Sequence, residues 1–134
     1  MFDICLITQS HPCFNPRLVK EADALVAAGF QVAVISPIYS EWGIQADEEF
    51  ADRSWQIVYR PQFGPRSSRH RRIGEFSRRV LGTALAKASR GRLPAAVNSA
   101  WHPVTIPLIK AAKRVKARLY IAHYPAALPA AAKS

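Results

Sequence analysis

Residues 1–35, MFDICLITQSHPCFNPRLVKEADALVAAGFQVAVI, decide the fold that we expect for this chain of 134 residues. The nearly continuous apolar run Phe2–Thr8 predicts a strand that is covered on both faces. Val32–Ile35 predicts a second buried strand. Strands linked by a helix are almost always parallel with a right-handed crossover, so this stretch is predicted to be a βαβ unit.

The helix between these two strands is marked by signals at both of its ends. Asn15 offers a side-chain oxygen to free helix N–H groups, and Pro16 suits the first helical position. Gly29 suits the left-handed turn that follows a last helical residue. The positions i, i+4, i+7 and i+8 form one apolar face of this helix, with Leu18, Ala22, Leu25 and Val26.

The rest of the chain predicts two more strands, Trp55–Tyr59 and Leu119–Ala122, with helical segments between and after them. Residues 36–54 have no clear period, so we expect a loop there with at most one short helical turn at 47–52. Phe63–Ser68 is predicted to be a connector. The predicted helical segments are an amphipathic helix ended by Gly91 and Pro94, a region over 97–116, and a helix that begins in Ala126–Ser134.

This alternation predicts the α/β class: one Rossmann-like domain over residues 1–134, with a doubly wound parallel sheet in the strand order 3-2-1-4. In that order strands one and four are neighbours, and ligands bind beyond their carboxyl ends. The segments expected to meet there are Gln9–Arg17 and His123–Pro125. The first of them ends at a helix N-terminus, which attracts phosphate or carboxylate groups.

Several motifs that would define other functions are missing from the sequence. There is no G-x-G-x-x-G after the first strand, which argues against a nucleotide-dependent reductase. There is also no phosphate-binding P-loop, no G-x-S-x-G and no paired-cysteine zinc spacing, so no metal site is predicted. Cys5 and Cys13 make no disulfide framework, which favours a cytoplasmic location.

Two stretches resemble the N-terminal domain of GT-B glycosyltransferases of the family 4 type. One is the block from Asn15 to Val34, with its R-x-x-K-E-A-x-x-L-x-x-x-G-x-x-V-x-V pattern, and the other is Leu119–His123. The resemblance implies a retaining enzyme without a metal cofactor, whose nucleotide-sugar donor is bound mainly by a second, C-terminal domain. Because this chain is short, we expect a truncated, acceptor-binding half that does not transfer sugar alone, with the missing domain or a second chain as its partner.

The resemblance also assigns roles to residues. His123 is implied as the histidine that contacts the donor sugar near the reaction centre, with capping of neighbouring backbone as the alternative. Arg17 and Lys20 are expected either to bind an anionic acceptor group or the donor pyrophosphate, or to form a solvated helix face. The predicted substrate-binding residues are Asn15, Arg17, Lys20, His11 and Tyr124.

The charge of the chain is strongly lopsided. The net charge is +10, and from Arg53 onward there are 17 Lys and Arg residues against a single acid, Glu75. Such a charge favours an anionic partner, although a solvated basic surface is an equal alternative. The arginines expected to form an anion-binding or membrane-binding surface on the amphipathic helix are Arg69, Arg71, Arg72, Arg78 and Arg79.

The amphipathic helix leaves two interpretations open. In the first, its apolar stripe, Ile73 to Ala88, packs on the sheet and the arginines are solvated. In the second, the helix is an interfacial element at an anionic membrane.

The main functional prediction is the acceptor-binding domain of a glycosyltransferase acting on a glycan or lipid-linked acceptor, in the cytoplasm or peripheral at the inner face of the membrane. The alternative is a basic α/β module that binds anionic membrane or nucleic acid without catalysis. Nucleic acid is the less favoured partner because no known nucleic-acid fold signature is present.

Overall fold

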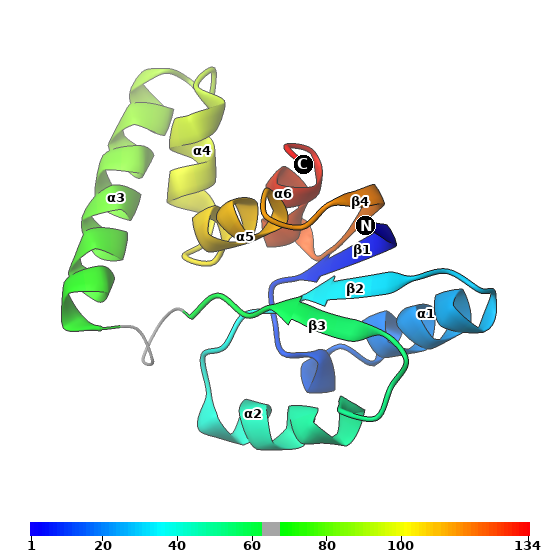
Figure 1. Ribbon diagram of the computed structural model, residues 1–134. Coiled ribbons are helices and arrows are strands. Elements are labelled where there is room, and N and C mark those ends of the chain that lie inside the picture. Colours follow the sequence, from blue (N-terminus) through cyan, green and yellow to red (C-terminus); the bar gives the residue numbers. More distant parts are fainter. Residues whose placement is uncertain (63–67) are drawn as a thin grey trace.

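The computed structural model describes residues 1–62 and 68–134 (Figure 1). Within these residues the chain forms one parallel sheet of four strands in the order β3-β2-β1-β4, so the predicted α/β class and strand order are confirmed. All but the last residue of the predicted connector Phe63–Ser68 lie outside the described residues.

The first strand, β1 (Phe2–Thr8), lies at the centre of the sheet. It pairs with β2 (Val32–Ile35) on one side and with β4 (Ala117–His123) on the other. The strand β3 (Gln56–Tyr59) forms the edge beyond β2. Every residue of β2 is buried, as expected for a parallel strand that is covered on both faces.

Helix α1 (Pro16–Ala27) covers one face of the sheet. Asn15 caps it, because the Asn15 Oδ1 accepts a hydrogen bond of 3.2 Å from the N–H of Leu18. Leu18 and Ala22 are fully buried, and Gly29 follows the helix with a φ of +91°. The predicted cap, apolar face and glycine stop of this helix are therefore confirmed. The core on this side contains Ile4, Leu6, Leu18, Ala22, Val32, Val34 and Trp55.

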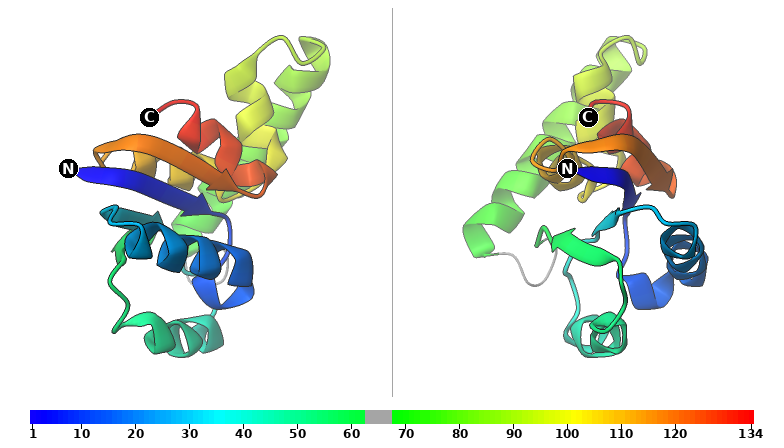
Figure 2. Two further views of the ribbon diagram at one scale, coloured as in Figure 1. Left: turned by 90° about the vertical axis from the view of Figure 1, so that its right-hand side faces the viewer. Right: turned by 45° about the vertical axis from the view of Figure 1, so that its right-hand side comes forward.

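The opposite face of the sheet is covered by α5 (Thr105–Ala112) and α6 (Leu128–Ala131), with the short 3-10 turn η4 (Pro125–Ala127) between β4 and α6 (Figure 2). These elements pack apolar side chains such as Leu108 and Ala127 against Cys5 and Ile7 of β1. The sheet thus has helices on both faces, which is the doubly wound arrangement.

The prediction of a loop over residues 36–54 was wrong at 41–47, whereas the short helical turn predicted at 47–52 is confirmed. This segment contains the helix α2 (Glu41–Asp47) and the 3-10 turn η2 (Glu48–Phe50). Ser40 begins α2 by accepting a hydrogen bond of 3.0 Å from the N–H of Gly43 through its side chain. The helix has only seven residues, so its sequence is too short to display a helical period.

The helical region predicted over 97–116 is two helices. The first, α4 (Pro94–Trp101), begins at Pro94, which was expected only to end the preceding helix. His102, Pro103 and Val104 then separate α4 from α5. Because proline lacks the N–H that a helix interior needs and clashes with the preceding turn, Pro103 explains the interruption.

Helix α3 (Arg69–Ala88) does not pack on the sheet. The expectation that its apolar stripe would pack there was therefore wrong. It lies beside α4, and together they form a hairpin that projects from the sheet and its covering helices (Figures 1 and 2). Its large apolar side chains are exposed: Ile73, Phe76, Val80, Leu81 and Leu85. Within the described residues, every helix is too short or too polar to traverse a bilayer.

Candidate functional site

The carboxyl ends of β1 and β4 form a small crevice. Thr8 and His123 are register partners at the ends of these two strands. A cavity of about 300 Å³ lies beside them, and it is lined by Asn15, Pro16, Arg17, His123 and Tyr124. The structure therefore brings together the two segments that the strand order predicted would meet, and four of the predicted site residues line one cavity.

His123 is held at the end of β4 with only 9% of its surface exposed. Its Nε2 lies 3.0 Å from a carboxylate oxygen of Glu21 on α1. The two groups are not aligned as a hydrogen bond, and Nε2 has no hydrogen-bond partner among the described residues. His123 thus lines the cavity through the partly exposed part of its ring, while its Nε2 is buried and faces the Glu21 carboxylate.

Glu21 is a residue of this site that was not predicted from the sequence. It lies one helical turn after Arg17 in α1, so both side chains project from the same side of the helix. The i, i+4 spacing from Arg17 could have predicted Glu21 as a site residue, because the first turn of α1 was already expected to face the crevice.

Tyr124 follows β4 with a φ of +73°, a left-handed conformation that is costly for a residue with a side chain. This conformation turns the chain directly from the strand into Pro125 and η4. The Tyr124 side chain is 44% exposed and lines the cavity next to His123. A strained residue therefore lies at the mouth of the crevice.

Of the other predicted residues, Asn15 is buried and holds the backbone in place, whereas Arg17 and Lys20 are exposed. Asn15 is buried, and its amide donates to Thr8 Oγ1 at 3.3 Å while its Oδ1 caps α1. It therefore ties the end of β1 to the start of the helix. Arg17 is exposed and lines the cavity, whereas Lys20 is exposed one turn farther along and does not line it.

His11 lies in the interior and takes no part in lining the cavity. Its Nδ1 is 2.7 Å from the Asp47 carboxylate, and its Nε2 accepts a hydrogen bond of 3.3 Å from the N–H of Tyr39. The Nδ1 also lies 3.1 Å from Nη2 of Arg60, so both ring nitrogens of His11 face polar groups of the protein. Asp47 also forms a salt bridge with Arg60 and accepts from the N–H of Cys13 at 3.0 Å. This network fixes the loop after β1 to α2 and to the end of β3.

Neither cysteine is prepared to act as a nucleophile. Burial raises the pKa of the Cys5 thiol to about 12. Burial, and then the hydrogen bond and negative charge of Asp47, raise the pKa of Cys13 to about 11. Both thiols are therefore protonated at neutral pH, and a protonated thiol is a poor nucleophile.

The predicted anion-binding arginines occupy α3. Arg69, Arg72, Arg78 and Arg79 are exposed, and the side chain of Arg71 lies outside the described part of the chain. They belong to the α3–α4 hairpin and not to the crevice, so the chain has two separate surfaces with candidate functions. Among the described residues, no group of three or more His, Cys, Asp or Glu side chains is placed to hold a metal ion.

Comparisons of the chain with protein-family models, with curated proteins and with solved structures returned no match. The fold and the crevice therefore define the structural class of this protein. It is an α/β chain with a Rossmann-like parallel sheet and a cavity at its topological switch point.

Proposed function

We propose that this chain is the N-terminal, acceptor-binding domain of a retaining GT-B glycosyltransferase. The observation that carries the proposal is the crevice itself, in which His123 at the end of β4 meets the N-terminus of α1 and Arg17. These are the elements that carry the resemblance to family 4 enzymes. The acceptor of the proposed reaction is a glycan or a lipid-linked sugar.

In this proposal His123 contacts the donor sugar near the reaction centre from its place in the cavity wall. Its rigid position at a strand end and the neighbouring Glu21 carboxylate fix the ring for that contact. Arg17, through its guanidinium and its backbone N–H at the start of α1, binds an anionic group of donor or acceptor. Asn15 positions this helix N-terminus. A C-terminal domain would supply most contacts to the nucleotide.

The test is a titration of the ¹⁵N-labelled chain with uridine diphosphate glucose, guanosine diphosphate mannose and short oligosaccharides, followed by NMR. We expect saturable shifts of the amides of Asn15, Arg17, Leu18, His123 and Tyr124, and an affinity that His123→Ala and Arg17→Gln lower by about tenfold each. Lys20→Gln is the matched control, because it removes a positive charge from α1 outside the cavity. Shifts that are absent, or that map outside the crevice for every ligand, would contradict the proposal.

The exposed face of α3 favours a second function, attachment to an anionic membrane. Phe76 is 70% exposed and Val80 is 55% exposed, with Leu81 at 61%. Around this apolar stripe the helix carries arginines, and its single acid, Glu75, is buried. A helix with an apolar face flanked by basic residues suits the boundary between headgroups and acyl chains.

Sedimentation with phosphatidylcholine vesicles containing increasing phosphatidylglycerol tests this second function. We expect binding to rise with the anionic fraction, and Phe76→Ser with Val80→Ser to weaken it about tenfold without loss of fold. Binding that ignores lipid charge excludes the membrane function. Tighter, salt-sensitive binding to random oligonucleotides than to vesicles favours nucleic acid instead.

A further inference from the structure

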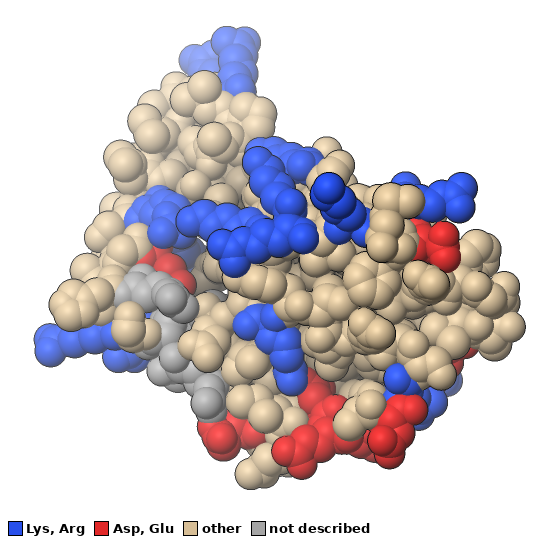
Figure 3. Space-filling view, viewed as in Figure 1, with Lys and Arg blue, Asp and Glu red and all other residues tan. Residues whose placement is uncertain are grey.

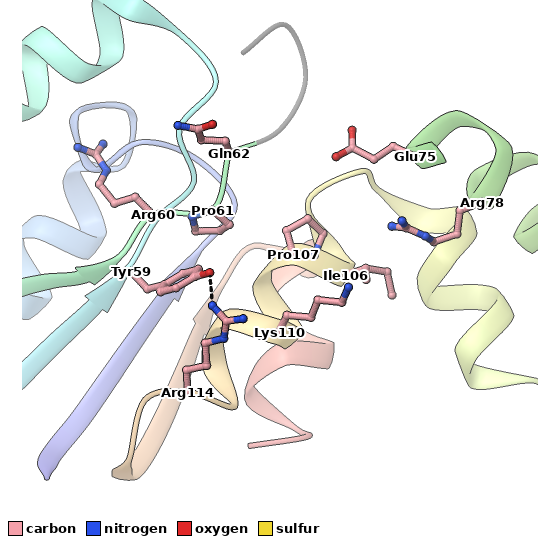
Figure 4. Close-up of a pocket in the computed structure, with 10 residues that line it drawn as sticks. All are labelled: Tyr59, Arg60, Pro61, Gln62, Glu75, Arg78, Ile106, Pro107, Lys110 and Arg114. Atoms are coloured by element: carbon pink, nitrogen blue, oxygen red, sulfur yellow. Dashed lines mark hydrogen bonds between the residues drawn. The ribbon is translucent and has the colours of Figure 1, made fainter. Parts of the chain in front are cut away.

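A second cavity lies between the end of β3, α3 and α5 (Figure 4). Its volume is about 420 Å³, which is within the usual range for small-molecule sites. It shares no lining residue with the crevice at the ends of β1 and β4. The residues around it include Tyr59, Arg60, Glu75, Arg78, Lys110 and Arg114.

The lining of this cavity is strongly basic. Four of its side chains are basic and one is acidic, which gives the lining a net charge of +3. Figure 3 shows Lys and Arg side chains gathered on the same face of the molecule over α5, while the acidic side chains gather over α2. Because like charges held together repel each other, an anion bound among them would be strongly favoured.

The basic side chains differ in how far their charge is already neutralised. Arg60 points away from the others in Figure 4 and forms its salt bridge with Asp47. Arg114 donates a hydrogen bond of 2.6 Å to the phenol oxygen of Tyr59, a neutral acceptor. Among the described residues, no carboxylate lies within salt-bridge distance of Arg78, Lys110 or Arg114. These three cations therefore carry the unneutralised charge of the cavity.

One of these cations is also held in a fixed position. The guanidinium carbon of Arg114 lies 5.3 Å from the centroid of the Tyr59 ring, and the hydrogen bond to Tyr59 restrains it further. A guanidinium that is positioned before binding loses less entropy when it pairs with an anion. Arg78 approaches from α3 and Lys110 from α5, so the cations come from two separate helices.

We propose that this cavity binds a phosphate group, either a phosphomonoester or a diphosphate, among Arg78, Lys110 and Arg114. Phosphate fits because its oxygens accept the paired N–H groups of guanidinium and its charge matches several cations at once. The phosphate belongs to a soluble metabolite or to a lipid headgroup, and this site is independent of the function proposed for the crevice.

The test uses inorganic pyrophosphate as the probe, with calorimetry for affinity and NMR for location. We expect saturable binding that shifts amides around 78, 110 and 114, and a Kd that rises about tenfold in Lys110→Gln and in Arg114→Gln. Lys113→Gln is the matched control, because Lys113 is exposed next to Arg114 and does not line the cavity. Both residues to be changed are exposed, so the variants should fold.

A parallel experiment replaces pyrophosphate with vesicles that contain phosphatidic acid, compared with phosphatidylglycerol vesicles of equal surface charge. Loss of pyrophosphate binding in the cavity variants supports a soluble source of phosphate. Loss of a preference for phosphatidic acid in the same variants, without pyrophosphate binding, supports a lipid source. The proposal is overturned if neither probe depends on Lys110 and Arg114, or if Lys113→Gln has the same effect as Lys110→Gln.

Discussion

Helices α1 and α3 both have an apolar stripe at helical spacing, but they use it in opposite ways. In α1 the stripe faces the sheet, and Leu18 and Ala22 are fully buried. In α3 the stripe faces outward, and Phe76 and Leu81 are more than half exposed. Amphipathic periodicity therefore predicts that a helix has an apolar face, and it does not identify what covers that face.

The contact between α3 and α4 explains the reversed orientation of α3. Gly82 faces α4 so closely that a Cβ atom added there would lie 2.8 Å from the Cβ of Ser99 and 3.0 Å from the backbone oxygen of Ala96. Small residues let the two helices approach closely, and the large apolar residues are left on the other side. In contrast, α1 is joined to β2 by only residues 28–31, a short connection that keeps it on the sheet.

The largest difference between the two helices should appear when one apolar side chain is shortened in each. Leu18→Ala should lower the free energy of unfolding by about 2–5 kcal/mol, because it leaves a cavity in the core. Phe76→Ala should change it by no more than about 0.5 kcal/mol, because that ring is exposed. Urea denaturation of both variants measures the difference. Equal losses would mean that the α3 stripe is buried in solution.

A smaller loss of stability is expected when the buried network of His11, Asp47 and Arg60 is disrupted. Asp47→Asn removes the carboxylate that pairs with Arg60 and His11. We expect a loss of about 2–3 kcal/mol, less than for a fully buried pair because Arg60 is partly exposed. Glu48→Gln is the matched control on the exposed surface beside it and should be nearly neutral. A neutral Asp47→Asn would show that the network does not fix these loops.

The smallest changes in stability should be confined to the α3–α4 hairpin. Replacing its glycines Gly82 and Gly74 by alanine should change the stability in opposite directions. Gly82→Ala should weaken the hairpin, by about 1–3 kcal/mol, because the new methyl group meets α4. Gly74→Ala should stabilise α3 by about 0.5–1 kcal/mol, since nothing lies within 4 Å of the added carbon. Hydrogen exchange of the α3 amides detects both changes. Stabilisation by both substitutions would contradict the close α3–α4 contact.

The sequence predicted the central part of the fold well because its signals there are local. The Asn15 cap, the Gly29 stop and the uninterrupted apolar strands act within a few residues, and together they determine the βαβ unit and the strand order. The crevice followed from that order, because neighbouring parallel strands end at the same edge.

The features that the sequence did not reveal depend on contacts between distant residues. Burial of His11 depends on Asp47, 36 positions away, so nothing near His11 indicated that it is a structural residue. The cavity beside Tyr59 depends on Arg114, which is 55 positions away. The orientation of α3 likewise depends on its partner helix, which sequence periodicity cannot identify.

The central prediction is that the crevice and the α3 stripe are two separate surfaces that bind separate ligands. The direct test measures two variants, His123→Ala and Phe76→Ser, in both the nucleotide-sugar titration and the vesicle sedimentation. We predict that His123→Ala weakens only nucleotide-sugar binding and that Phe76→Ser weakens only vesicle binding. Loss of both kinds of binding in either variant, or nucleotide-sugar binding that persists unchanged in His123→Ala, would contradict this prediction.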